Sequence, residues 1–285
     1  YDRIRKIESV QSDIVTTSQT SAVPEGDIDF NIDTFQFEGE TEPDLKDVHF
    51  QIKQGMTLGI VGHTGSGKSL LIRLLLREFD TKHPEDIQYG GRPIRDYEIN
   101  KLRGQFGYVP QEHFLFSSTI RGNIAFSQPD VADETIFHAS SMSHIHQDIL
   151  SLPEGYNTVV GERGVSLSGG QKQRISIARA LMTDPQILIL DDALSAVDAE
   201  TETAILNNLK QERQGKTNII TAHRMSAVMH ADMIIVMRHG TIIERGTHEQ
   251  LMANEGWYAE TYRSQAMQSR ITHDLESEVD GGERK

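Results

Sequence analysis

A glycine-rich run between two apolar segments has the residue types needed to hold phosphate groups. Residues 62–69 read GHTGSGKS, after the apolar run MTLGIV and before the helix-like segment SLLIRLLLREF. Glycines allow backbone N–H groups to wrap around a phosphate, and a strand before and a helix after is the context that a phosphate-binding P-loop requires. Lys68 is expected to reach the β- and γ-phosphates, and Ser69 to offer its hydroxyl to Mg²⁺. The residues expected at the phosphates or the metal ion are Gly62, Gly65, Ser66, Gly67, Lys68 and Ser69.

An acid pair after a second apolar run could complete this site. The stretch ILILDD, residues 187–192, has the pattern of a buried strand that ends in carboxylates. Asp191 is expected to hold Mg²⁺ through a water molecule. Asp192 is a candidate general base, which must come within ~2.6–3.2 Å of the water that it activates. Because aspartate is one methylene shorter than glutamate, its carboxylate is set back by about 1 Å, and such a misplacement can cost ~100-fold in rate. Either Asp192 is a misplaced base, or the backbone shifts and Asp192 works.

Composition narrows the class of protein. The chain has 285 residues, of which 37% are apolar and 25% charged, as in an ordinary globular protein. The net charge of −14 argues against a broad nucleic-acid-binding face, and no nucleic-acid partner is expected. The absence of cysteine excludes disulfides and cysteine-ligated zinc. No apolar run approaches the roughly 18 residues that span a bilayer. Because the chain begins with Tyr1 and not with methionine, we hypothesise that it is a piece of a longer protein.

The patterns around these motifs indicate an α/β protein. DIDFNIDTFQF and LKDVHFQI alternate apolar and polar residues, as half-exposed strands do. MTLGIV, ILIL, TNIITAH and DMIIVM are buried-strand patterns separated by helix-like segments, which argues for a sheet core between helices. We expect a linker over residues 1–23, a domain over 24–266, and an inserted helical subdomain at about 112–180. The polar, acidic residues 267–285 are expected to form a disordered tail.

The stretch LSGGQKQR, residues 167–174, gives these motifs a family context. From about residue 24 to about 266 the sequence resembles the nucleotide-binding domain of an ATP-binding cassette (ABC) transporter. The motifs occur in the order of that family: the P-loop, the Q-loop in GYVPQEHFLF, the LSGGQ signature, the Walker B acids in ILILDD, the D-loop in SAVD, and the switch histidine in ITAHR. The resemblance implies further nucleotide-site residues, namely Phe37, Gln111, Ser168, Gly169, Gly170, Gln171, Asp198 and His223.

The resemblance also implies an arrangement and a set of roles. The fold would be a P-loop NTPase core of the ABC ATPase type, with an N-terminal antiparallel β portion and an inserted helical subdomain. Gln111 would contact Mg²⁺ and the reaction centre, and His223 would contact the γ-phosphate. Two domains would pack head to tail around two ATP molecules, each held by the P-loop of one domain and the signature of the other. Phe37 stands where a tyrosine commonly stacks on adenine; it keeps the π-face, although simple strand packing is the alternative.

Other stretches resemble the exporter branch of the family. They are TVVGERGVSLSGGQ, LFSSTIRGNIAF, GTIIERGTHEQLM and GWYAETYRSQ. In such half-transporters a membrane domain precedes this domain in the same chain, which places the domain at the cytoplasmic face of the membrane. Cargo specificity would lie in the membrane part, and multidrug export is the hypothesis for heterodimeric exporters.

The aspartate at position 192 resembles the degenerate site of heterodimeric exporters, in which one partner lacks the usual glutamate base. The intact LSGGQ would then serve the competent site of a different partner chain. A homodimer with Asp192 as a working base is the alternative. A soluble ABC ATPase without a transport role is disfavoured by the exporter-like segments and by the acidic charge.

Overall fold

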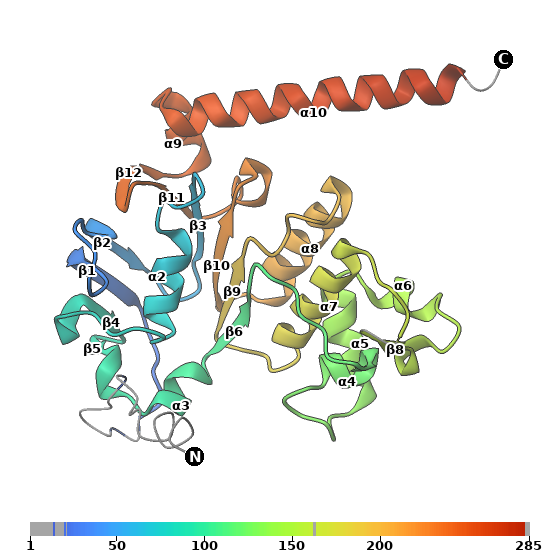
Figure 1. Cartoon of the computed structure of the whole chain (residues 1–285), viewed down its shortest axis with the longest axis horizontal. Coiled ribbons are helices and arrows are strands. Elements are labelled where there is room, and N and C mark those ends of the chain that lie inside the picture. The colour runs from blue at the N-terminus through green and yellow to red at the C-terminus, as the bar shows by residue number, and fades with distance from the viewer. Residues whose placement is uncertain (1–13, 15–19, 21, 162–163, 283–285) are drawn as a thin grey trace.

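The computed structural model describes residues 14, 20, 22–161 and 164–282, and its centre is a six-stranded sheet (Figure 1). The strand order is β12-β11-β3-β10-β9-β6, and all neighbours are parallel except the hairpin β11–β12. The four predicted buried strands are confirmed as β3, β9, β10 and β11. The strands are β3 (Thr57–Gly62), β6 (Phe106–Val109), β9 (Ile187–Asp191), β10 (Thr217–Ala222), β11 (Met233–Arg238) and β12 (Thr241–Gly246).

A second, antiparallel sheet packs at the N-terminal side of the domain. Its order is β2-β1-β4-β5, with Ile28 opposite Ile52 and Phe35 opposite Leu45 in the β1–β2 pair. The predicted alternation is confirmed, since Ile28, Phe30 and Ile32 are buried whereas their neighbours are more exposed. The strands are β1 (Ile28–Phe35), β2 (Leu45–Ile52), β4 (Ile87–Tyr89) and β5 (Arg92–Pro93).

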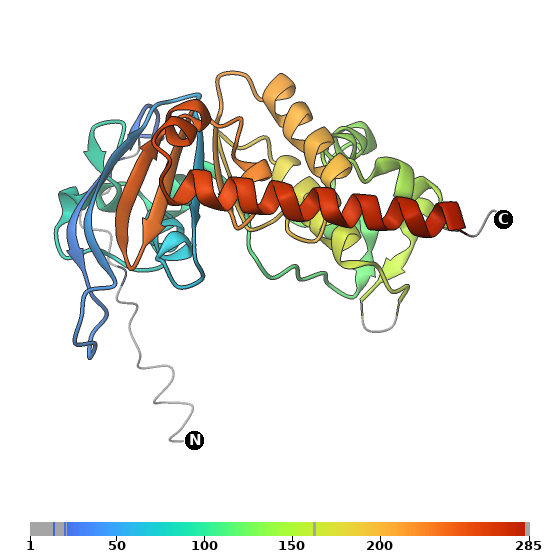
Figure 2. The ribbon, with the colours of Figure 1, turned by 90° about the horizontal axis from the view of Figure 1, so that it is seen from above.

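The expected helical subdomain lies at the opposite end of the molecule from the antiparallel sheet (Figures 1 and 2). Within residues 112–180 it contains α4 (Ile120–Ile124), α5 (Asp133–Met142) and α6 (His146–Leu150), the small ribbon β7 (Ser118–Thr119) with β8 (Val159–Val160), and most of α7 (Gly169–Leu181). The remaining helices are α2 (Lys68–Leu75), α3 (Ile99–Arg103) and α8 (Ala199–Glu212).

The central sheet is buried on both faces, which explains why its strands read as continuous apolar runs. Leu188 and Leu190 pack into a core on the helical side. Ile187 and Ile189, which alternate with them, pack into a second core shared with the antiparallel sheet and α2. Parallel sheets covered on both faces have this sequence signature. The two cores hold the carboxyl ends of the strands in fixed positions.

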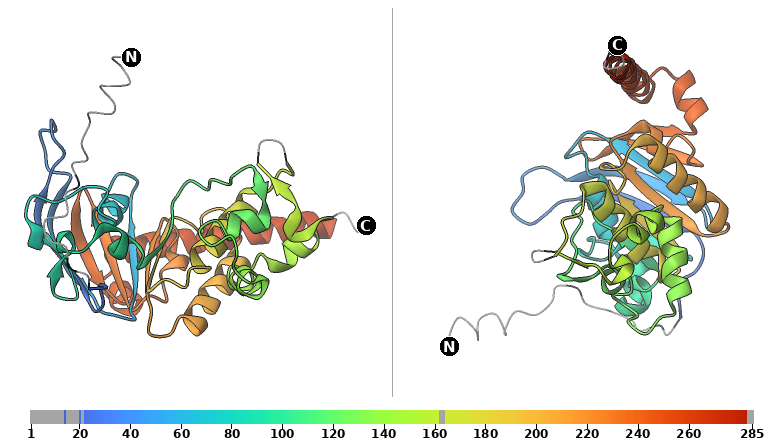
Figure 3. Two further views of the ribbon diagram at one scale, coloured as in Figure 1. Left: turned by 90° about the horizontal axis from the view of Figure 1, so that it is seen from below. Right: turned by 90° about the vertical axis from the view of Figure 1, so that its right-hand side faces the viewer.

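The C-terminal region consists of two helices. They are α9 (His248–Ala253) and α10 (Trp257–Gly282), and α10 runs through residues for which a polar tail is expected. The segment has no proline and no glycine before Gly281, so nothing in its sequence breaks a helix. In Figure 3, α10 stands beside the body of the domain and runs along its length. Most of the predicted linker, residues 1–23, lies outside the described residues, among which no helix is long and apolar enough to cross a membrane.

Candidate functional site

Four adjacent strands deliver the predicted site residues to one edge of the central sheet. The order β3-β10-β9-β6 is parallel throughout, so the four carboxyl ends meet at that edge. The P-loop follows β3, His223 follows β10, Asp191 ends β9 and Gln111 follows β6 shortly after its end. A cleft of about 360 Å³ there is lined by Phe37, Thr64 to Ser69, Gln111, Asp191, Asp192 and His223, among others. Ligands of open α/β sheets bind at this edge.

The backbone of the P-loop requires its glycines. Gly62 has φ 147°, and a side chain there would meet the carbonyl oxygen of Met237 at 2.2 Å. Gly67 has φ 102° and precedes the first residue of α2, so it provides no side chain to cap that helix. The first N–H groups of α2 are therefore available to an anion, and the helix dipole favours negative charge at that point.

Lys68 lies inside the loop with its ammonium group satisfied by backbone. Lys68 is only 7% exposed, and its Nζ donates to the carbonyl oxygens of Gly62 at 2.8 Å and His63 at 3.0 Å. Burial lowers the pKa of Lys68, while the nearby charges of Asp192 and Asp191 act in the opposite direction. The cation is thus partly desolvated and has no direct carboxylate partner among the described ion pairs, which suits it to a phosphate.

Asp191 and Ser69 form a cluster of hard oxygen atoms. Ser69 Oγ lies 3.1 Å from Asp191 Oδ1, which also accepts a hydrogen bond from Thr221 Oγ1 at 2.6 Å. Tyr108 OH donates to Asp191 Oδ2 at 3.4 Å, and Asp191 itself is buried. Hydroxyl and carboxylate oxygens are ligands that Mg²⁺ prefers, and it binds through few protein groups with waters and substrate phosphates. The pair therefore fits Mg²⁺. Ser66 Oγ is buried without a hydrogen-bond partner within the described part, as a phosphate-facing hydroxyl would be.

Asp192 lies in the cleft on a backbone that is held on both sides. It has φ 50°, a left-handed conformation that aspartate tolerates better than most residues. Its N–H donates to Thr221 O at 3.1 Å and Oγ1 at 3.0 Å, and its carbonyl accepts from Ser195 Oγ at 2.9 Å. Gln111 Nε2 is 3.5 Å from Asp192 Oδ2, so the structure brings these two predicted residues together.

Phe37 packs against neighbouring rings and also lines the cleft. Its ring meets Phe35 edge-on with centroids 5.0 Å apart, and Phe79 in the same way at 4.8 Å. The guanidinium of Arg73 lies over the Phe79 ring at 4.6 Å. Phe37 is half-buried just beyond the end of β1, and its N–H is fixed by Asp44 Oδ2 at 3.0 Å.

The signature and D-loop residues lie outside this cleft. Ser168 Oγ accepts from Gln171 N at 3.2 Å, and Gln171 Oε1 accepts from Ser168 N at 3.0 Å, which makes a reciprocal cap on α7. Gly170 sits so close to the loop after β9 that a side chain there would meet Ala196 O at 2.8 Å. Asp198 caps α8 by accepting from Thr201 N at 2.9 Å, a bond that lowers the pKa of Asp198. Ser168, Gly169, Gly170, Gln171 and Asp198 do not line the cleft around the P-loop.

Three residues of the site were missed by sequence reasoning. Thr221 bonds both acids of the pair, and its signal was a hydroxyl two residues before His223. Tyr108 supports Asp191 from β6, and burial raises its pKa. His113 lies near enough to Asp192 to feel its charge, although burial is the larger influence and lowers the pKa of His113. No spacing rule identifies His113.

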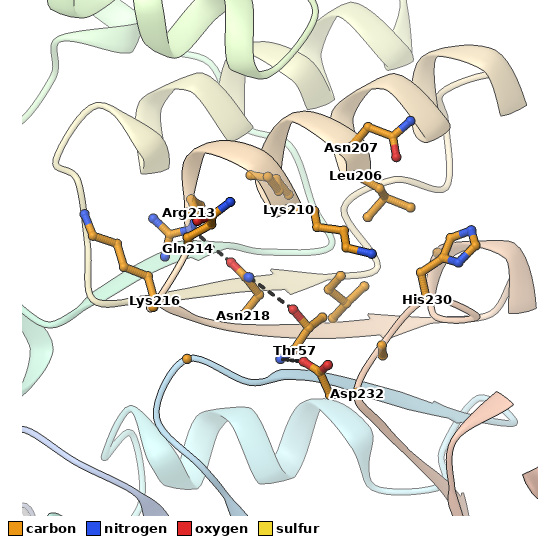
Figure 4. A pocket seen from close by; sticks show the side chains of 16 residues that line it. Thr57, Leu206, Asn207, Lys210, Arg213, Gln214, Lys216, Asn218, His230 and Asp232 are labelled. Carbon is orange, nitrogen blue, oxygen red and sulfur yellow. Dashed lines mark hydrogen bonds between the residues drawn. The ribbon is translucent and has the colours of Figure 1, made fainter.

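A second hollow, of about 400 Å³, lies at the opposite, amino-terminal end of the strands (Figure 4). Asn218 Nδ2 donates to Thr57 Oγ1 at 3.2 Å, and Thr57 N donates to the Asp232 carboxylate at 2.7 Å. Arg213, only 4% exposed, donates to Asn218 Oδ1 at 2.9 Å and to Pro185 O at 3.0 Å. The polar groups at the base of this hollow bond one another, which is the pattern of a structural network.

Known proteins with similar sequences and structures agree with this geometry. The family model described as "ABC transporter" matches residues 45–195. The chain is 48% identical over 267 residues to "Probable multidrug resistance ABC transporter ATP-binding/permease protein YheI" of Bacillus subtilis (strain 168), covering 93% of this chain and 46% of that protein. It is 47% identical over 273 residues to "Multidrug resistance-like ATP-binding protein MdlA" of Escherichia coli (strain K12), and the match covers 95% of this chain and 46% of that protein.

The structural comparison gives the same result. A solved bacterial Atm1-family ABC exporter with ATP bound superposes with a TM-score of 0.87 and 34% identity, over 93% of this chain and 47% of that one. The chain thus spans about half the length of these relatives. It belongs to the ABC transporter family, as an ATP-binding domain.

Proposed function

We propose that this chain is the ATP-driven motor domain of an ABC exporter half-transporter whose own site hydrolyses ATP slowly. The observation that carries the proposal is Asp192, an aspartate at the position where the family usually has a glutamate base. The backbone of Asp192 is tied to Thr221 on one side and to Ser195 on the other. Because those bonds keep the backbone from advancing, the missing methylene leaves the carboxylate set back from an attacking water.

The other residues of the cleft support nucleotide binding. The P-loop amides and the start of α2 would hold the β- and γ-phosphates, with Lys68 adding a charge. Mg²⁺ held by Ser69 and Asp191 would neutralise the phosphate charge. Phe37 would offer its ring to the adenine. A site that binds well and cleaves poorly acts as a clamp, because bound ATP stabilises the closed state until it is hydrolysed or released.

A second domain would be needed for this domain to close around ATP. The exposed start of α7, with Ser168 and Gly169, lies outside the cleft around this chain's own P-loop. Its N–H groups and serine suit the γ-phosphate of an ATP held by a partner. An intact signature beside a weakened base fits a heterodimer in which this chain completes the partner's competent site. The observation that would favour a homodimer is brisk turnover by this chain alone.

The membrane part of a half-transporter would dock near the Q-loop. Phe114 and Phe126 are 65% and 55% exposed, and Phe116 links them with an edge contact to Phe114 and a stacked contact to Phe126 at 4.4 Å. Phe114 and Phe116 of this cluster follow Gln111 by only a few residues, so movement of a docked membrane helix would reach the reaction centre. Large exposed aromatic patches mark interaction sites. Export of drug-like molecules is proposed by analogy with the names of the relatives.

Steady-state ATPase activity at high protein concentration with Mg²⁺ tests the proposal. Wild type is compared with Asp192→Glu, which restores the length, and Asp192→Asn, which keeps the size and removes the charge. We expect little turnover in wild type, little change in Asp192→Asn, and a gain of about ten-fold or more in Asp192→Glu. If wild type is brisk, Asp192→Asn abolishes activity and Asp192→Glu adds little, Asp192 is a working base and the homodimer is the better description.

A further inference from the structure

The C-terminal helix α10 is bonded directly to the loop that carries His223. Gln265, on α10, uses both ends of its amide: Nε2 donates to His223 O at 2.8 Å, and Oε1 accepts from Met225 N at 2.9 Å. These two backbone groups flank Arg224, so a single half-buried side chain brackets the connection between β10 and the short 3₁₀ helix η4 (Met225–Ala227). A bidentate amide fixes both the position and the orientation of that connection.

The bracketed residue continues the network toward the acid pair. The Arg224 guanidinium donates to Val197 O at 3.0 Å and to Leu194 O, and it pairs with Glu202 at the start of α8. Leu194 and Val197 belong to the loop between Asp192 and α8. Hydrogen bonds, joined through the backbone at Arg224, therefore connect α10 to the His223 loop and to the loop after Asp192.

The first residue of the same helix reaches the P-loop. Trp257 Nε1 donates to His63 Nε2 at 3.2 Å, and the two rings meet with centroids 5.2 Å apart. The backbone carbonyl of His63 in turn accepts from Lys68 Nζ at 3.0 Å. Trp257 and Gln265 are eight positions apart in one helix, which is about 12 Å along its axis. One rigid element thus holds two loops of the site at a set separation.

The geometry points to a role for α10 in catalysis: we propose that Gln265 is a positioning residue that sets His223 against the γ-phosphate, with Trp257 fixing the helix relative to the P-loop. The inference rests on the proposed function, in which His223 would contact the γ-phosphate. Loss of the amide frees the His223 carbonyl and the Met225 N–H to rotate, so the imidazole samples positions away from the phosphate. The cost falls on turnover and not on nucleotide affinity, since Gln265 does not line the nucleotide cleft.

The test separates turnover from binding in the full 285-residue chain. Gln265→Met removes both hydrogen bonds at similar size, Gln265→Glu keeps the acceptor for Met225 N, and Met267→Ala, at a residue 65% exposed on the same helix, is the control. Each variant is made both in the wild-type chain and in Asp192→Glu, so that ATP hydrolysis is fast enough to measure in at least one of the two. We expect kcat to fall about five- to ten-fold in Gln265→Met, less in Gln265→Glu, and not in Met267→Ala, with the Kd for ATP within about two-fold throughout.

His223→Ala, made in the Asp192→Glu background, distinguishes a failure of the positioning role of Gln265 from a failure of the role of His223 itself. If His223→Ala lowers kcat and Gln265→Met does not, the positioning role is wrong while the proposed function stands. If His223→Ala leaves kcat unchanged, the proposed role of His223 itself fails, and the inference about Gln265 fails with it. If Gln265→Met raises Kd in step with the loss of kcat, or lowers the melting temperature so that binding and turnover fall together, α10 has only a structural role. A fall in kcat at constant Kd supports the proposal.

Discussion

The two ends of the central sheet use similar polar residues in opposite ways. At the amino end, Arg213, Asn218, Thr57 and Asp232 bond one another around the hollow of Figure 4. At the carboxyl end, Lys68 donates only to backbone carbonyls, and the buried Ser66 hydroxyl has no partner among the described residues. Polar side chains that bond one another stabilise the fold, whereas a cation bonded to backbone carbonyls and a hydroxyl without a partner are available to a ligand.

The largest predicted effect is at Lys68. Lys68→Met removes a charge-assisted contact to the phosphates, worth about 2–3 kcal/mol, so the Kd for MgATP should rise on the order of 100-fold. Stability without nucleotide should not fall, because removal of a partly desolvated cation offsets the two lost bonds, and the His63 carbonyl keeps its bond from Ser66 N. Calorimetric titration and thermal unfolding measure the two quantities. An unchanged Kd for MgATP, or a large loss of stability, would contradict the distinction between polar groups that stabilise the fold at the amino end of the sheet and polar groups that bind a ligand at the carboxyl end.

For Arg213 we predict the opposite result, a loss of stability with little change in the affinity for MgATP. Arg213→Met leaves Asn218 Oδ1 and Pro185 O without their buried donor, so the free energy of unfolding should drop by about 2 kcal/mol. The Kd for MgATP should stay within about two-fold, since the nucleotide cleft lies at the far end of the strands. Denaturant unfolding with a parallel ATP titration checks this. A nucleotide-dependent phenotype would mean that the hollow of Figure 4 communicates with the site.

A smaller effect is predicted at Phe37. Phe37→Ala should weaken ATP binding about ten-fold through loss of stacking, whereas Phe37→Tyr should leave it unchanged. Inorganic triphosphate, which has no base, provides the matched control and should bind both variants and wild type alike. Equal weakening of ATP and triphosphate binding in Phe37→Ala would show that Phe37 acts by packing against Phe35 and Phe79.

The smallest effect is the pH dependence that Lys68 gives to stability. Burial lowers the pKa of Lys68 below the 10.5 that it has when unfolded. The charged form is therefore less stable in the folded chain, so Lys68 destabilises the fold below the lowered pKa. This penalty disappears as the pH rises from the lowered pKa to 10.5. The difference in melting temperature between Lys68→Met and wild type should narrow over that window, and a constant difference would argue against a desolvated ammonium.

Local sequence was sufficient for the parts of the site that one strand and its following loop can build. The P-loop, the acid pair and the buried strands are each specified by contiguous residues. Asp192 and Gln111, 81 positions apart, were brought together only through the family's motif order. Thr221 and Tyr108 were missed because their role depends on which strands are neighbours in the sheet.

The contacts of the C-terminal helix could not be predicted from local sequence, because they join residues that are far apart in the chain. Trp257 bonds a residue 194 positions away, and Gln265 one 42 positions away, and neither has a local pattern that differs from ordinary helix packing. The polar composition of residues 267–285 favours disorder, whereas the absence of helix breakers allows the helix that the structure has through Gly282. The short strands β4 to β8 likewise depend on their partners more than on their own few residues.

The most direct test of the account is the chemical state of nucleotide held at this site. The chain is incubated with MgATP, freed rapidly of unbound nucleotide, and the bound fraction is quantified as ATP or ADP by chromatography over time, in wild type and in Asp192→Glu. We expect wild type to retain ATP for at least about ten times longer than Asp192→Glu, which converts it to ADP. Equally fast conversion in both would contradict it, because Asp192 would then be a competent base on an adapted backbone.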